Sequence, residues 1–307
     1  MAGTKKNARM KRRAKETVFY WSIVILPLLQ FCVFYVAVNA NSVILAFKSY
    51  NTETGLYSFA GFANFTAFIR DMAGMPALKT ALKNSLIVWL SGLAVGLPLA
   101  QFFSFYIYKK MPLHGFFRVM LFLPSVVSAV ITVALYKYFV DRAWPEAARA
   151  LFGVKMPMPL ATLSTRFPAI LVYNVWVSFG TGILLYTGSM TQISVSVAES
   201  ARLEGANSFQ EYWHITLPSI WPMATTFLVV GVASIFTNQA SVYTFYQDQA
   251  DNSLYMFGYF LFQRVIGKAA TLADYPYAAA GGIALTAIAV PLTLGAKALL
   301  EKCGPKE

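Results

Sequence analysis

Six long stretches without a charged side chain constrain this chain more than any other feature of its sequence. Each has roughly the 20 residues that a helix needs to cross a hydrocarbon core. Lipid offers the backbone no hydrogen-bond partner and the stretches lack the alternation of barrel strands, so each must be helical. We therefore expect an all-α integral membrane protein with six transmembrane helices, over residues 20–47, 84–108, 119–136, 167–198, 219–247 and 275–296.

Composition supports this class and excludes several others. Of 307 residues, 57% are hydrophobic and only 12% are charged, about half the charged fraction of a soluble domain. The net charge of +12 lies in a tail and in short loops, which is typical of a membrane surface rather than of nucleic-acid binding. Cys32 and Cys303 are too far apart along the fold for a useful disulfide, and His114 and His214 lack the companions of a metal site.

Basic residues at the N-terminus predict the orientation. This end has seven basic residues and one acidic residue, Glu16, so the positive-inside rule places it in the cytoplasm. The basic residues are Lys5, Lys6, Arg9, Lys11, Arg12, Arg13 and Lys15. Six crossings return the C-terminus to the same side, in agreement with Lys109, Lys110, Arg118, Lys297, Lys302 and Lys306. A secretory signal peptide is the alternative, but the first stretch is too long and no cleavage site follows it.

One predicted cytoplasmic loop, residues 199–218, has its own local structure. We expect a short helix that begins at Glu199 and runs through Leu203, a turn at Gly205, and a second short helix ended by Pro218. Phe209, Tyr212 and Trp213 would share one face of the second helix. A helix lying on the bilayer would carry Lys and Arg, whereas this segment carries acids, so its shape favours a protein partner.

The same loop resembles the coupling loop of binding-protein-dependent ABC importers, the EAA motif E-A-A-x3-G-x9-I-x-L-P. Six positions match at the family spacing, Ser200 replaces an alanine, and Glu204 stands where many sugar-type members have Asp. The resemblance implies that the ATPase is coupled through Glu199, Ser200, Ala201, Gly205, Ala206, Ile215, Leu217 and Pro218.

Further segments resemble the maltose-type carbohydrate permeases. They are Gly61-Phe-Ala-Asn64-Phe65, Asn84-Ser-Leu, Phe117-Arg118 and Phe122-Leu-Pro124. One departure is the Gly-Gly-Pro that commonly follows the fifth span, since residues 247–253 replace it here. On this basis residues 1–18 are a basic cytoplasmic tail, 19–300 a permease domain with coupling loop 194–218, and 301–307 a second tail.

The family implies a transport subunit of a bacterial or archaeal cytoplasmic membrane. It would pair with a second homologous permease in a heterodimer, two ATPase subunits and an external solute-binding protein, and work by alternating access. The chain has no GxxxxGK[ST], so the partners would bind ATP, and we expect no enzyme activity, cofactor or metal in the chain itself. The outer loops 48–83, 137–166 and 248–274 are either docking surfaces or solvated connectors.

Two other functions remain as alternatives. An ion-coupled secondary transporter would need acids at the membrane midplane, and none of the six stretches contains one. A membrane enzyme would need a nucleophile with a base, or a metal cluster, within the spans. Glycerol phosphate or a polyol also remain possible solutes, although the lack of Lys and Arg in the stretches favours a neutral ligand.

A sugar site would be lined by uncharged polar and aromatic side chains. The fourth stretch offers Tyr173, Asn174, Trp176 and Ser178, and the fifth offers Asn238, Gln239 and Tyr243. Asn174, Trp176 and Asn238 fall at places that resemble substrate-contacting positions of disaccharide-transporting members. Polar residues in membrane bundles also bridge helices, at about 0.6 kcal/mol each, so both interpretations stay open.

Overall fold

A computed structural model describes residues 2–305, and the side chains of residues 15–305. The basic tail residues Lys5 to Arg13 and Lys306, on which part of the orientation argument depends, lie outside the described side chains. The chain divides into two compact units. One runs from the N-terminus to Phe68 and includes Thr271–Ile283, and the other comprises Ile69–Ala270 and the chain from Ala284 onward.

Most of the predicted spans are present among the described residues. Four helices are long and apolar enough to cross a membrane, over Lys15–Ala46, Pro76–Tyr108, Leu163–Met190 and Asp274–Cys303. Two further spans are bent pairs of helices, His114–Val126 with Ala129–Phe152 and Ser208–Ser219 with Trp221–Ser234. The all-α membrane fold is confirmed, and the count is six when each bent pair is one span.

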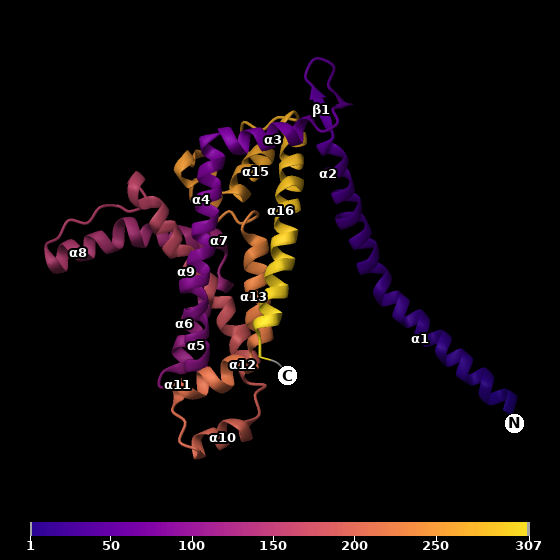
Figure 1. The fold of residues 1–307 in the computed structure, drawn as a ribbon, viewed down its shortest axis with the longest axis vertical. Helices are drawn as coiled ribbons and strands as arrows, with labels where there is room; N and C mark the ends of the chain where they lie inside the picture. Colours follow the sequence, from indigo (N-terminus) through magenta and orange to yellow (C-terminus); the bar gives the residue numbers. More distant parts are fainter. Residues whose placement is uncertain (1, 306–307) are drawn as a thin grey trace. The chain divides into compact units, whose positions relative to one another are not determined.

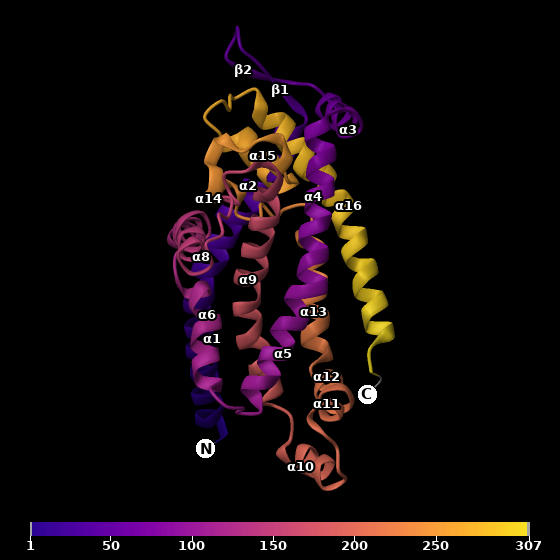
Figure 2. The same cartoon turned by 90° about the vertical axis from the view of Figure 1, so that its left-hand side faces the viewer.

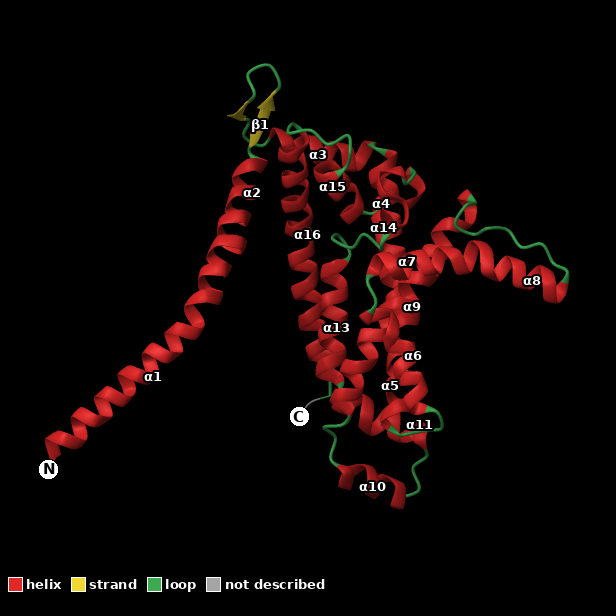
Figure 3. Cartoon of the chain, turned by 180° about the vertical axis from the view of Figure 1, so that it is seen from behind, coloured by secondary structure: helices red, strands yellow, loops and turns green. Residues whose placement is uncertain are grey.

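The first unit begins with a continuous helical run and ends that run in a hairpin. The run comprises α1 (Ala2–Gln30), the π-helical turn η1 (Phe31–Ala37) and α2 (Val38–Ala46). Strands β1 (Lys48–Asn51) and β2 (Leu56–Phe59) then pair antiparallel (Figures 1 and 3). Asn64, in α3 (Ala63–Gly74), donates from Nδ2 to the carbonyls of Ala46 and Lys48 at 2.9 and 2.7 Å, which fixes the helix to the hairpin.

The second unit is a helical bundle. One rod comprises α4 (Pro76–Ser91), η2 (Gly92–Gly96) and α5 (Leu97–Tyr108), and it runs beside α9 (Leu163–Met190) and α13 (Trp221–Ser234) (Figures 1 and 2). Helix α6 (His114–Val126) packs closely on α9. A Cβ at Gly180 would lie 2.6 Å from the carbonyl oxygen of Leu121, so only glycine allows this approach.

The third predicted span is broken rather than straight. Helix α6 gives way at Val127 and Ser128 to α7 (Ala129–Tyr138), which turns away by 111°. Pro124, in the last turn of α6, removes a backbone donor and so weakens the helix just before the break. The chain continues through η3 (Phe139–Ala143) and α8 (Trp144–Phe152) before it returns to α9.

The fifth predicted span is shorter than expected. The prediction of one helix over 219–247 is wrong, because α13 ends at Ser234 and a turn separates it from α14 (Val242–Tyr246). Ala240 and Ser241 in this turn have left-handed backbones, with φ of +46° and +59°. Asn238, just before them, accepts from the Ala240 amide with its Oδ1 at 2.7 Å, a local bond that competes with the helix.

The segment that departs from the family pattern is well anchored. It forms the 3₁₀ turns η5 (Gln247–Gln249) and η6 (Asn252–Leu254), and α15 (Phe257–Ile266) and α16 (Asp274–Cys303) follow. Asn84 donates to the carbonyls of Ser253 and Tyr255 at 2.8 and 3.0 Å. Arg166 Nη1 lies 2.5 Å from Asp251 Oδ2, so the segment is held to the start of α9.

Candidate functional site

The loop between α9 and α13 forms the predicted helix–turn–helix. Its helices are α10 (Val195–Leu203) and a second run made of α11 (Ser208–Glu211), η4 (Tyr212–Thr216) and α12 (Leu217–Ser219). Gly205 turns the chain between them with φ of +87°, a conformation that L side chains rarely adopt. Asn207 then caps the second run, because its Oδ1 accepts from the Gln210 amide while Gln210 Oε1 accepts from the Asn207 amide, both at 2.9 Å.

Two details of the predicted loop differ. Glu199 does not begin the first helix, because α10 starts at Val195 after Ser194 and places Glu199 in its middle. The three aromatic residues also do not share one face. Tyr212 is half-buried against Phe105, with ring centroids 5.3 Å apart, whereas Phe209 and Trp213 are 71% and 50% exposed.

The motif residues divide between exposed and seated positions. Glu199, Ser200 and Gly205 are exposed at the end of the second unit, where α10 lies beyond α11 (Figures 1 and 2). The remainder are buried or partly buried and seat the loop on the bundle: Ala201, Ala206, Ile215, Leu217 and Pro218. Leu203, 89% exposed, adds apolar surface to the exposed side. The loop therefore offers a partner both a carboxylate and apolar side chains.

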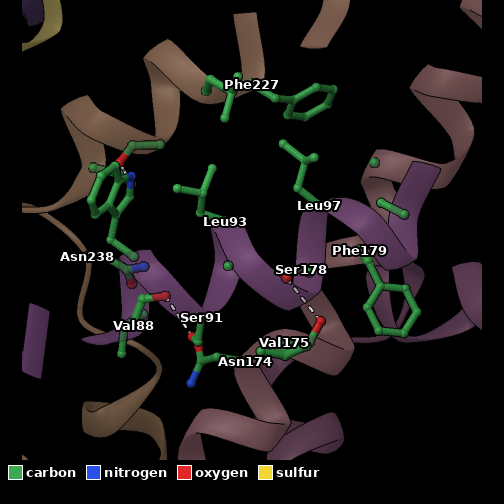
Figure 4. A pocket seen from close by; sticks show the side chains of 18 of the residues that line it. Val88, Ser91, Leu93, Leu97, Asn174, Val175, Ser178, Phe179, Phe227 and Asn238 are labelled. Atoms are coloured by element: carbon green, nitrogen blue, oxygen red, sulfur yellow. Dashed lines mark hydrogen bonds between the residues drawn. The ribbon is translucent and has the colours of Figure 1, made fainter. Parts of the chain in front are cut away.

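A cavity of about 250 Å³ lies inside the second unit. It is lined by the α4–α5 rod, α9 and α13, and Figure 4 shows Leu93 and Leu97 projecting from the rod toward Phe227. Among the side chains that the structure describes, residues 15–305, no Asp, Glu, Lys, Arg or His lines it. Its polar lining residues are Ser85, Ser91, Asn174, Ser178, Ser234 and Asn238, and its aromatic ones are Trp89, Phe179, Tyr186 and Phe227.

Of the seven predicted lining residues, the structure brings three to the cavity and leaves four elsewhere. Asn174, Ser178 and Asn238 line it, and Gln239 and Tyr243 do not. Tyr173, 2% exposed, instead packs among Tyr136 and Phe245, and Trp176 stacks on Tyr136 at 6.3 Å. The reason is helical periodicity: residues four apart from Asn174 share its face of α9, whereas positions 173 and 176 point to other faces.

The two asparagines hold the turn after α13 as well as facing the cavity. Asn174 Nδ2 donates to the carbonyl oxygens of Ile170 and Ala240, both at 2.8 Å. Asn238 Oδ1 accepts from the amide of Ala240 at 2.7 Å. The other polar atom of each side chain, Asn174 Oδ1 and Asn238 Nδ2, makes no hydrogen bond to the described residues and so stays available to a ligand.

The sequence argument missed the contribution of the second span. Positions 85, 89, 92, 96 and 100 all line the cavity, and their spacing of four, three, four and four residues places them on one face of a helix. That spacing was a usable signal. Gly96 lies against Ser178 of α9, since an added Cβ would be 3.4 Å from Ser178 Oγ, and Trp89 supplies the aromatic face expected of a sugar site.

Comparisons with known proteins agree with this geometry. The model of the family described as "Binding-protein-dependent transport system inner membrane component" matches residues 92–305. The multiple sugar-binding transport system permease protein MsmF of Streptococcus mutans is 25% identical over 232 residues, 74% of this chain and 77% of its own length. The diacetylchitobiose uptake system permease protein NgcF of Streptomyces coelicolor is 26% identical over 302 residues, 91% of this chain and 81% of its own.

A solved structure has the same fold. It is a chain of a bacterial ABC transporter involved in the import of the acidic polysaccharide alginate, with a TM-score of 0.76. The match covers 96% of this chain and 99% of the other at 19% sequence identity, a level at which the likeness shows the fold alone.

Proposed function

The chain belongs to the family of binding-protein-dependent transport system inner membrane components, and from this membership we propose that it is the permease subunit of an ATP-driven importer for a neutral carbohydrate. The observation that carries the proposal is the exposed helix–turn–helix of residues 195–219, in which the EAA-type residues surround the left-handed Gly205. A compact loop with an exposed acid and exposed apolar side chains suits the cleft of a separate ATPase subunit.

The neutral sugar follows from the cavity and from the relatives. The relatives are named for multiple sugars and for diacetylchitobiose. Another, 27% identical over half of this chain, is named for maltose and maltodextrin, and one 23% identical over 87% of this chain is named for arabinooligosaccharides. The cavity offers hydroxyls, amides and an indole, which can hydrogen-bond and stack on a sugar, but no cation to neutralise an acidic one. We therefore infer a neutral mono- or oligosaccharide rather than an acidic ligand.

The mechanism that suits these parts is alternating access. Two ATPase subunits would close on ATP and move the coupling loops of this chain and of a second, homologous permease. An external solute-binding protein would deliver the sugar. With the loop on the cytoplasmic side and six crossings, both termini would lie in the cytoplasm of a bacterial or archaeal cell.

Substitutions in the exposed half of the loop test the proposal. Gly205→Asp and Glu199→Lys should leave the chain inserted and abundant in the membrane but abolish sugar uptake, because both alter the surface offered to the ATPase. No atom lies within 4 Å of an added Cβ at Gly205, so the chain itself has room for the side chain, at a cost from φ of about 1–2 kcal/mol. Glu204→Asp, in the same turn, is the matched control and should transport normally. Normal uptake by all three variants would make the loop a bystander and overturn the proposal.

A further inference from the structure

A buried carboxylate joins the coupling loop to the transmembrane bundle. Glu211 receives Lys109 Nζ at 2.6 Å on Oε1 and 2.5 Å on Oε2, and the side chains of the two residues are only 3% and 9% exposed. Arg202 Nε lies 3.8 Å from Glu211 Oε2. Lys109 caps the C-terminus of α5 and Arg202 is in the last turn of α10, so a single carboxylate connects α10, α11 and α5.

A second contact lies beside the first. The hydroxyl of Tyr212 donates to Oε1 of Gln101 at 2.7 Å, and Gln101 is 6% exposed. The Tyr212 ring meets Phe105 edge to face. Gln101, Phe105 and Lys109 are four residues apart, so one stripe of α5 makes all of these contacts with Glu211 and Tyr212. We call these five residues the clasp.

The buried ion pair of the clasp fixes the geometry of the loop more than it stabilises the fold. Removing two charges from water costs about as much as their attraction returns, so a buried ion pair adds little stability over an apolar pair of the same volume. What such a pair does provide is one geometry, because either charge left without the other inside the protein is strongly unfavourable. The clasp therefore fixes the second helix of the loop to α5 in a single register.

The stripe also leads to the cavity. Leu97 and Ala100 of α5 line the cavity, and Gln101 is the next residue after Ala100. On the N-terminal side of the clasp, α5 is continuous with η2 and α4. These two elements supply the other cavity-lining residues of the α4–α5 rod. A displacement of the loop that is fixed to α5 must therefore displace the wall of the cavity as well.

We propose that the clasp is the positioning element that transmits ATPase-driven movement of the coupling loop to the cavity wall through α5. This inference rests on the proposed function, since it presumes that the loop is driven by an ATPase. It assigns Lys109, Glu211, Gln101 and Tyr212 a role that lies outside the EAA motif itself, in which none of them is a matched position.

Charge reversal tests the proposal in the complex purified with its partner subunits and placed in lipid vesicles. The measured quantity is sugar taken up per ATP hydrolysed, with a panel of labelled maltose, diacetylchitobiose and arabino-oligosaccharide as the probe. Lys109→Glu and Glu211→Lys should each lower this ratio about tenfold, and the double variant should restore it to within about threefold of wild type, as expected for residues in one ion-pair network. Single variants that lose membrane level yet keep the wild-type ratio in the assembled fraction would show a merely structural pair and overturn the proposal.

Tyr212→Phe is the second variant, for the case in which the reversed chains do not assemble. It keeps the ring contact with Phe105 and removes only the hydroxyl that bonds Gln101, so the complex should still assemble, with a lower melting temperature because this bond is lost, while uptake per ATP falls severalfold. An unchanged ratio would overturn the proposal. Phe209→Leu, on the exposed face of the same helix, controls for general perturbation of the loop.

Gly205→Asp in the same vesicles separates the two claims. If Gly205→Asp is inactive while the clasp variants keep the wild-type ratio, the importer function stands and the clasp fails. If Gly205→Asp transports normally, the loop is not a coupling element and the function proposal itself fails.

Discussion

At the scale of single residues, the cavity combines structural and ligand-facing roles in the same side chains. Asn174 and Asn238 each use one polar atom to hold Ala240 in its left-handed conformation, and keep the other for the cavity. Replacing either asparagine therefore disturbs the turn as well as the site. Trp89 lines the cavity and makes no side-chain hydrogen bond to the described residues, which makes it a cleaner probe of sugar binding.

Trp89→Ala should raise the KM for sugar uptake about fivefold with little change in kcat, because the lost stacking contributes roughly 1 kcal/mol. Trp176→Ala, which removes the same side chain from a position outside the cavity, is the matched control and should leave KM unchanged. Initial rates of labelled-sugar uptake over a concentration series measure both. A larger effect at Trp176 than at Trp89 would contradict the assignment of the cavity.

The segment of residues 247–256, which Asp251 joins to Arg166, should lose its ordered structure only below about pH 4. Partial burial acts to raise the pKa of Asp251, but hydrogen bonds from Ser253 and the Arg166 guanidinium outweigh it and hold the pKa below its usual 3.8. A lowered pKa means that the carboxylate stabilises the fold above the unfolded value near 4, and that this contribution is lost as pH falls through the lowered pKa. The protection of amides 247–256 against hydrogen exchange, relative to an unfolded chain at the same pH, should be constant from neutral pH down to about 4 and fall below it. Asp251→Asn should lower this protection at neutral pH, and a loss of protection that begins near pH 6 in wild type would refute the account.

At the scale of elements, the bundle depends on the close crossing of α6 and α9. Gly180→Ala places a methyl group against the Leu121 carbonyl and should destabilise the protein by about 1–3 kcal/mol or more, the cost of overpacking. Gly188→Ala in the same helix meets no atom within 4 Å and serves as the control. Thermal unfolding in detergent compares the two variants, and equal melting temperatures would show that the crossing is looser than described.

Sequence could predict the long helices but not where they break. The absence of charge identifies a segment that must be helical in lipid, which explains why the spans around α4–α5, α9 and α16 were predicted. The absence of charge does not show where a helix bends or ends. The 111° bend after α6 and the early end of α13 were therefore not predicted. The end of α13, for example, depends on a tertiary contact, the bond of Asn174 to Ala240, which joins α9 to the turn after α13 across 66 residues of sequence.

The coupling loop was easier to predict than the cavity, for a physical reason. Its turn requires a left-handed backbone at Gly205 and its second helix is capped by the neighbouring Asn207, so local sequence determines the turn, although it did not reveal that the first helix begins at Val195. A cavity is formed by three helices at once, and only the relative rotation of each helix decides which side chains face it. Tyr173 and Trp176 were therefore misplaced although their helix was correctly predicted.

At the scale of the whole molecule, the orientation in the membrane has a direct test. In a chain with Cys32 and Cys303 replaced by serine, a cysteine at Asn252 should react with an impermeant reagent from outside the cell, and one at Asn207 should not. The expectation follows from six crossings with the coupling loop in the cytoplasm. Labelling in the reverse pattern would invert the topology and place the loop out of reach of a cytoplasmic ATPase.

The central claim is that ATP, bound by partner subunits, drives sugar uptake through this chain. We would measure accumulation of labelled maltose, diacetylchitobiose and arabino-oligosaccharide in vesicles that contain the complex co-purified with this chain and are supplied with its binding protein. ATP enclosed on the side of the coupling loop should drive accumulation of at least one of these sugars, ionophores should not reduce it, and Gly205→Asp should abolish it. Accumulation that persists without ATP and collapses with an ionophore would instead identify an ion-coupled transporter and contradict the account.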